Sequence, residues 1–255
     1  MTKTHRLMWF AGSVLMLMLL IYGWQMLADA KVLPRAFFPG PDRTWSALQK
    51  GFVTGGMLDD LFITVRRMAL GWALASLIGV GLGAVVGTSA WARAWIAPTF
   101  EALRPLPASA IAPLATLAFG LTDGMILALI AFGAVWPMLL TTVHGFASVH
   151  VRRYEVARSL GMSRPAFIWK IALPGAMPDI FSGLRLGLTV ALILVVVGEM
   201  ITVQGGLGSR ILLAARAFNA AAIFAGIAML GLIGLLTNAA LSAAESHLLR
   251  WQRRS

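Results

Sequence analysis

The stretch that decides the fold is YEVARSLGMSRPAFIWKIALP, residues 154–174. It is a long polar, charged interval between strongly apolar segments. Val156, Ala157 and Leu160 recur at helical spacing. Gly161 follows them, and glycine adopts the left-handed conformation that ends a helix at little cost. The first half of the stretch therefore predicts a short helix that stops at a glycine corner.

A second helix is expected directly after this corner. Ser163 can cap its N-terminus, and Pro165 suits its first turn. Its apolar residues continue to Ile171, and Pro174, which lacks a backbone donor, is expected to end it. Two short helices and a corner together predict a compact knob, residues 154–174.

The rest of the composition is that of a membrane protein. Of 255 residues, 59% are hydrophobic and 12% are charged, and the mean hydropathy is +0.82. Soluble domains carry about 25% charged residues. The net charge of +11 comes from basic residues in short segments between apolar runs, which favours membrane topology over nucleic-acid binding. We therefore expect an all-α polytopic protein in the lipid membrane, with no nucleic-acid partner.

Six apolar segments approach the ~20 residues that a transmembrane helix needs. The expected spans are residues 7–28, 68–87, 105–121, 125–143, 184–203 and 221–244. The first resembles a signal peptide, but it exceeds the ~7–15 residues of a signal core, so an uncleaved, peripheral helix is expected. Core helices are expected within 68–244, and residues 1–255 form one transmembrane domain. Three prolines predict a broken third span, preceded by a turn at 88–104.

The longest interval between spans lies before the second one. Asp42 or Thr44 is expected to cap a short helix with Trp45, Leu48 and Phe52 on one face. Such a helix is expected to rest on the outer leaflet.

Basic residues are unequally distributed over the segments between spans. One set of segments contains Lys3, Arg6, Arg93, Arg104, Arg152, Arg153, Arg158, Arg164, Lys170, Arg250, Arg253 and Arg254. The alternate set contains only Lys31, Arg35, Arg43, Lys50, Arg210 and Arg216. Because cytoplasmic loops are rich in Lys and Arg, both termini and the knob are expected in the cytoplasm. Arg66 and Arg67, at a span end, are expected to extend to the headgroups.

Small residues recur every four positions in two of the expected spans. They are Gly79, Gly83 and Gly87 in the second span, and Gly183 and Gly187 in the fifth. Close packing drives helix association in lipid, so both rows predict helix–helix contacts.

Polar chemistry inside the spans is sparse. Glu199 lies well inside an apolar run, where a carboxyl group suggests either a proton or cation site or a structural hydrogen bond to a neighbouring helix. The sequence contains no GxxxxGK[ST], HExxH or GxSxG motif, no histidine pair at ligand spacing and no cysteine. We therefore expect no catalytic residue, no metal site and no enzyme activity, so any energy must come from another polypeptide.

The knob resembles the EAA loop of ABC-importer permeases. The resemblance rests on Glu155, Ala157 and Gly161, followed after nine residues by Ile171, Leu173 and Pro174, with Val156 in place of the middle alanine. In that family the loop is cytoplasmic and its first helix fits a cleft on the ATP-binding subunit. The resemblance implies a coupling loop at 147–179. The implied coupling residues are Glu155, Val156, Ala157, Arg158, Leu160, Gly161, Ile171, Leu173 and Pro174.

Residues 38–49, FPGPDRTWSALQ, resemble the LPSP-type stretch of the nitrate, sulfonate, taurine and bicarbonate branch of these permeases. The resemblance implies a bacterial inner-membrane location, a second copy of the chain, an ATP-binding subunit and an extracytoplasmic solute-binding protein. ATP would be bound by the partner, and this chain would bind no cofactor. The solute would be small, of sulfonate, taurine, nitrate or vitamin-precursor type. The branch commonly has a Glu-Met pair at the place of Glu199, which favours a structural role for it.

Two other functions remain open at this point. One is a secondary transporter driven by an ion gradient, with Glu199 as its relay. The other is a membrane scaffold that transports nothing and recruits a partner through the knob.

Overall fold

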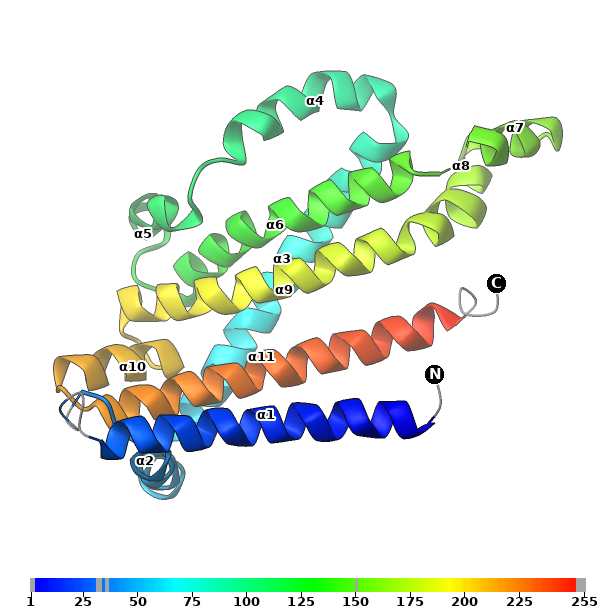
Figure 1. The fold of residues 1–255 in the computed structure, drawn as a ribbon. Coiled ribbons are helices and arrows are strands. Elements are labelled where there is room, and N and C mark those ends of the chain that lie inside the picture. The colour runs from blue at the N-terminus through cyan, green and yellow to red at the C-terminus, as the bar shows by residue number, and fades with distance from the viewer. Residues whose placement is uncertain (1–2, 31–33, 35–36, 150, 251–255) are drawn as a thin grey trace.

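The computed structural model describes residues 3–30, 34, 37–149 and 151–250, and all regular secondary structure within them is helical (Figure 1). The elements are α1 (Lys3–Asp29), α2 (Pro41–Val53), α3 (Met57–Thr88), α4 (Ala90–Leu103), η1 (Ala108–Ile111), α5 (Ala112–Phe119), α6 (Asp123–Ala147), α7 (Val151–Ser159), α8 (Arg164–Phe167), η2 (Ile168–Ala172), α9 (Leu173–Thr202), α10 (Leu207–Arg216) and α11 (Ala220–Leu248).

Within these described residues, five helical stretches are long and apolar enough to cross a membrane, and a bent pair makes a sixth if it counts as one span. The expected all-α polytopic fold with about six spans is therefore confirmed. Four cations used for the topology prediction, Lys31, Arg35, Arg253 and Arg254, lie outside the described residues.

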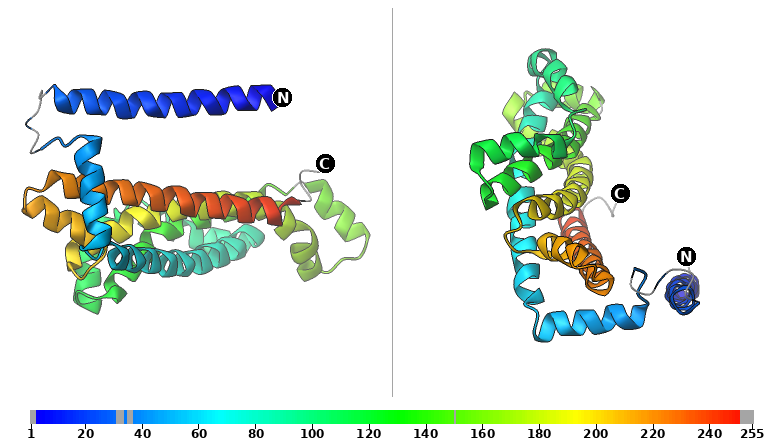
Figure 2. Two further views of the ribbon diagram at one scale, coloured as in Figure 1. Left: turned by 90° about the horizontal axis from the view of Figure 1, so that it is seen from below. Right: turned by 90° about the vertical axis from the view of Figure 1, so that its left-hand side faces the viewer.

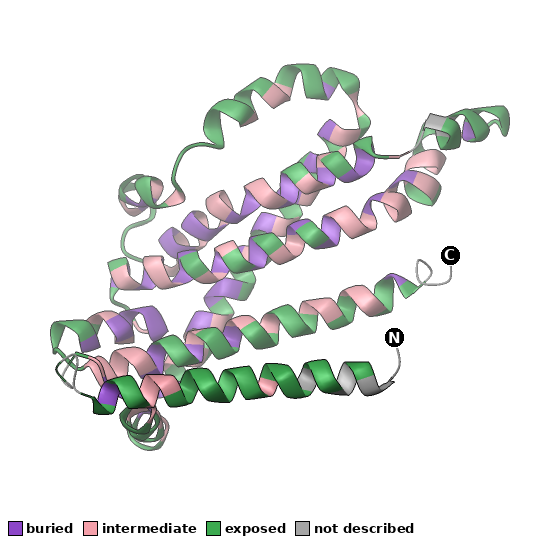
Figure 3. Cartoon of the chain, in the orientation of Figure 1, coloured by how far each residue is buried: buried purple, intermediate pink, exposed green. Residues whose placement is uncertain are grey.

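Helix α6 is the centre of the bundle and packs along both α3 and α9. Its side chains Ile126, Leu129, Ile130 and Met138 are fully buried, and they form one core with residues of α3 and α9. Figure 3 shows buried positions along α6 and α9, whereas α1 is exposed along nearly all of its length. The packed body of the molecule is therefore built around α6.

The predicted turn at 88–104 is wrong, because this segment is mostly helical. Ser89 caps α4 by accepting a hydrogen bond from the Ala92 amide at 3.2 Å. The break comes later, where α4 and the helix of residues 108–119 meet at 85°. Pro105 and Pro107 lie in this break. They account for it, because proline disfavours the helical conformation of the residue before it and has no N–H to donate to the helix.

Helix α2 lies crosswise to α1 and α11 at the end of the bundle opposite the two termini (Figure 2). Its expected cap is wrong: Gly40 is the N-cap, and the Thr44 hydroxyl donates to the Gly40 carbonyl at 3.0 Å. Leu48 and Phe52 pack against the core, whereas Trp45 is 61% exposed. Leu48 and Phe52 are therefore partly buried against the core whereas Trp45 is exposed, because α2 has a packed side and an open side.

Candidate functional site

Helix α7 ends in a glycine cap that fixes the direction of the knob. Gly161 has φ of +69°, in the left-handed region. Its amide donates to the Arg158 carbonyl and the Met162 amide donates to the Ala157 carbonyl, both at 3.0 Å. This pair of bonds is the Schellman motif, which satisfies carbonyls that the helix end would otherwise leave unpaired. The corner is thus a defined backbone structure with a glycine at its one left-handed position.

The side chains of α7 divide into buried and exposed. Ala157 is 2% exposed, so it packs within the chain and is not available for a partner to approach. Val156 and Leu160 lie one turn apart and are 58% and 73% exposed. Glu155 and Arg158 are also exposed. The knob therefore presents an apolar pair and opposite charges to its surroundings.

The second helix of the knob does not end at Pro174, so that prediction is wrong. Helix α8 continues through the π-helix η2 into α9, and residues 164–202 form one 39-residue span. Pro174 lies in the first turn of α9, where its missing N–H is tolerated because the π-turn already interrupts the regular ladder. Leu173 packs against a small core at this end of the bundle, while Ile171 is half-buried. The second helix of the knob is consequently continuous with a transmembrane helix.

The glycine rows let helices approach backbone to backbone. A Cβ placed on Gly83 of α3 would lie 2.8 Å from the Leu139 carbonyl oxygen of α6, and Gly79 and Gly87 face α6 in the same way.

On the other side of α6, a Cβ on Gly187 of α9 would lie 3.2 Å from the Ala134 carbonyl oxygen. A Cβ on Gly183 would lie 3.0 Å from the Cα of Met138. Both neighbours of α6 thus contact it closely through glycine, so a movement of α9 must involve α6.

A buried polar cluster lies at the opposite end of the bundle from the knob. The Glu199 side chain is 0% exposed. The Thr64 hydroxyl lies 2.9 and 3.0 Å from its two carboxyl oxygens, and the Gly208 amide donates to one of them at 2.9 Å. Arg67 Nη1 is 3.3 Å from the other oxygen. Donors from α3 and α10 thus bind both oxygens of this carboxyl group, which fits the structural role.

Arg67 does not extend to the headgroups, as had been expected, but is 4% exposed and joins three segments. Its Nη2 lies 2.6 Å from Asp123 Oδ1 at the start of α6. It also donates to the carbonyls of Gln204 and Gly205 in the turn between α9 and α10. Burial of an arginine is tolerated because every part of its guanidinium has a partner. Arg66, half exposed, pairs with the same Asp123 at 2.7 Å.

The same turn is held by a second ion pair that the sequence reasoning missed. Asp60 of α3 accepts from the Gly206 amide at 2.9 Å and from Arg210 Nε at 2.7 Å. The available signal was the occurrence of Asp60 and Arg67 two turns apart near a span end. Their partners, 56 or more residues away, could not be chosen from the sequence.

Within the described part of the chain, no group of three or more metal-ligating side chains could hold an ion. The described structure thus combines long apolar helices, a knob on one of them and a hydrogen-bonded turn at the opposite end.

Comparison with known proteins identifies the family. Residues 75–254 match the model of the binding-protein-dependent transport system inner membrane component. The chain is 31% identical over 244 residues to a putative aliphatic sulfonates transport permease, SsuC, of Bacillus subtilis (strain 168), covering 96% of this chain and 88% of that protein. It is 30% identical to the taurine transport system permease TauC of Escherichia coli (strain K12), covering 94% and 89%. This chain therefore belongs to the family of binding-protein-dependent transport system inner membrane components.

A solved structure has the same fold. The crystal structure of an amino acid ABC transporter with histidines superposes with a TM-score of 0.59 at 18% identity, covering 80% of this chain and 97% of that chain. At this identity the likeness concerns the fold alone.

Proposed function

We propose that this chain is the permease subunit of an ABC importer and that it couples solute movement to a separate ATPase through residues 147–179. Membership of the family and the fold support the transport role. The observation that carries the coupling role is the continuous helix from α8 through η2 into α9, which the hydrogen-bonded corner at Gly161 joins to α7. A force applied to the knob can reach the centre of the membrane only if no flexible loop intervenes.

The exposed side of α7 is the proposed contact with the ATP-binding subunit. Val156 and Leu160 would fill an apolar part of its cleft, while Glu155 and Arg158 would provide charged contacts at the edge. Gly161 sets the direction of the helix. Ile171, Leu173 and Pro174 would transmit the movement into α9, and the glycine contacts would pass it to α6.

The assembly follows from the same role. Two copies of the chain would surround the path in the bacterial inner membrane, each with its termini and knob in the cytoplasm. The knob and both termini lie at the same end of the bundle, which supports this orientation (Figure 1). ATP would bind to the partner subunit, and an extracytoplasmic binding protein would deliver the solute to the other end.

A sulfonate-type solute is the proposed cargo. Two relatives are named as permeases for aliphatic sulfonates and for taurine, which is itself a sulfonate. The resemblance of residues 38–49 to the nitrate, sulfonate, taurine and bicarbonate branch agrees with this assignment.

An ion-driven carrier with Glu199 as relay is less well supported. A relay group needs access to water in at least one state, whereas Glu199 is 0% exposed and donors occupy both of its oxygens.

The test combines purification with uptake. The tagged chain is extracted gently together with its partners, and radiolabelled taurine uptake is measured in the same strain. Leu160→Asp and Glu155→Lys should no longer co-purify the partner that carries GxxxxGK[ST] and should lose most uptake, because they alter the proposed contact surface. Both side chains are exposed, so the fold of the chain should be unaffected. Leu160→Met, which keeps the apolar contact, should retain both. Normal uptake by Leu160→Asp at an equal amount of protein in the membrane would contradict the coupling role. If the unaltered chain binds the ATP-binding partner but takes up no taurine, only the proposed solute is rejected.

A further inference from the structure

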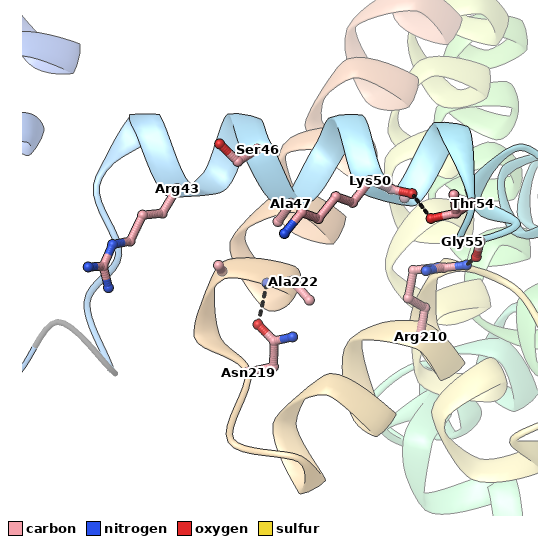
Figure 4. A pocket seen from close by; sticks show the side chains of 11 residues that line it. Arg43, Ser46, Ala47, Lys50, Thr54, Gly55, Arg210, Asn219 and Ala222 are labelled. Carbon is pink, nitrogen blue, oxygen red and sulfur yellow. Dashed lines mark hydrogen bonds between the residues drawn. The ribbon is translucent and has the colours of Figure 1, made fainter.

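A pocket of about 500 Å³ lies between α2, the start of α10 and the start of α11 (Figure 4). Residues that line it are Arg43, Ser46, Ala47, Lys50, Gly51, Thr54, Gly55, Arg210, Asn219, Ala221 and Ala222. Three of these described residues are cations and none is a carboxylate. The lining therefore carries a net positive charge, on the side of the protein where basic residues are fewer.

The cations differ in how far their charge is already balanced. Arg210 is held by Asp60 at 2.7 Å and also donates to the Gly55 carbonyl, so it forms a fixed wall. Arg43 and Lys50 are exposed, and no ion pair is found for either among the described residues. They lie two turns apart on the same side of α2. Figure 4 shows Lys50 reaching from α2 toward the turn of Asn219.

The opposite wall adds neutral donors. The Asn219 side-chain oxygen accepts from the Ala222 amide at 3.2 Å, so its NH₂ group is the donor that remains for other partners. Ala221 belongs to the first turn of α11, whose amides have no partner within the helix. The positive end of this 29-residue helix therefore lines the same pocket as Lys50.

The position of the pocket decides between possible anions. Helix α2 lies crosswise at the end of the bundle (Figure 2), and it exposes Trp45 and Val53, at 61% and 81%. An exposed tryptophan on a helix in this position is typical of the membrane interface, where lipid phosphates lie. We propose that this pocket binds the anionic, phosphate-bearing headgroup of a phospholipid, with Lys50 and the start of α11 at the phosphate and Arg43 at the edge of the pocket. This site is separate from the coupling role proposed for the knob.

The experiment measures lipid binding by the full-length chain. Phosphatidylglycerol is titrated into mixed micelles of the purified protein, and bound lipid is counted by native mass spectrometry. A basic residue near a lipid surface contributes about fivefold in affinity, so Lys50→Gln should weaken binding about fivefold and the Arg43→Gln/Lys50→Gln double variant roughly 30-fold. Arg216→Gln removes an exposed cation at the same end of the bundle but outside the pocket, and it should leave binding unchanged.

Several results would overturn the assignment. Equal affinity for phosphatidylcholine would mean that the charge is not recognised, and unchanged phosphatidylglycerol binding in the double variant would place the lipid elsewhere. Displacement of the lipid by inorganic phosphate at matching concentration would indicate a site for soluble anions. Loss of binding-protein-stimulated ATPase in the double variant, with lipid binding intact, would make the pocket a protein contact instead.

Discussion

Replacing Glu199 tests whether the buried cluster holds the molecule together or carries ions. Glu199→Ala removes the acceptor for the Thr64 hydroxyl, the Arg67 guanidinium and the Gly208 amide. Loss of one partner from a buried ion pair costs about 3–5 kcal/mol. Asp123 still balances Arg67 at 2.6 Å, so we expect the lower end of this range.

Glu199→Gln is the milder form of the same change. The amide keeps the volume and one acceptor oxygen, but its NH₂ group faces other donors. Hydrogen bonds to charged groups contribute about 1.5–3 kcal/mol, so a loss of about 2 kcal/mol in the free energy of unfolding is expected. In a chain of this size each kcal/mol shifts the thermal midpoint by roughly 2–4 °C. The midpoint should therefore fall by about 4–8 °C for glutamine and by about 6–12 °C for alanine.

The assay measures thermal unfolding of the purified chain, with tryptophan fluorescence as the signal. Glu101→Gln, at an exposed position of α4, is the matched control and should melt like the parent. Glu199→Gln combined with Arg67→Met should lose less stability than the two single changes added, because the residues interact. Suppose that Glu199→Gln unfolds at the same thermal midpoint as the parent, and that uptake by the parent is abolished by uncouplers. These two results together would refute the structural role and establish a relay.

Three further changes test the packing, the knob and the orientation. Gly83→Val should cost about 1–3 kcal/mol in thermal unfolding because of overpacking, whereas Gly81→Val, whose added Cβ would have no neighbour within 4 Å, should cost little; equal losses would contradict the packing argument. Gly161→Ala should strain the left-handed corner by about 1–3 kcal/mol and lower the transport obtained per ATP hydrolysed, and an unaltered ratio would show that the corner is not needed. Since the chain has no native cysteine, Ser159→Cys and Phe218→Cys can be labelled singly in cells with a permeable outer membrane. A maleimide that cannot cross the inner membrane should reach only the cysteine at 218, and the opposite pattern would reverse the topology.

The local features of the chain could be predicted because each depends on neighbouring residues. Apolar runs must form helices in a membrane, since lipid offers no partner for free backbone groups. Gly161 ends α7 as expected because the left-handed conformation is a property of that residue itself. The resemblance of residues 154–174 to the EAA loop likewise depended only on local spacing, and the family match confirmed the class of permease.

Other local rules failed where the structure offered the chain an alternative. Pro174 does not end the helix, because the π-turn of η2 moves it to the first turn of α9. Residues 88–104 read as a turn, but Ser89 caps a helix there.

The sequence by itself therefore determined the membrane class, the approximate spans, the knob and its glycine corner, because hydropathy and backbone preference act over a few residues. Only the tertiary structure decided what Arg67 and Glu199 do. Each was a charge at or inside an apolar run, and its role depends on partners from helices far along the chain. A buried charge is stable only when packing brings an opposite charge and hydrogen-bond donors to it, and that meeting is a property of the folded bundle.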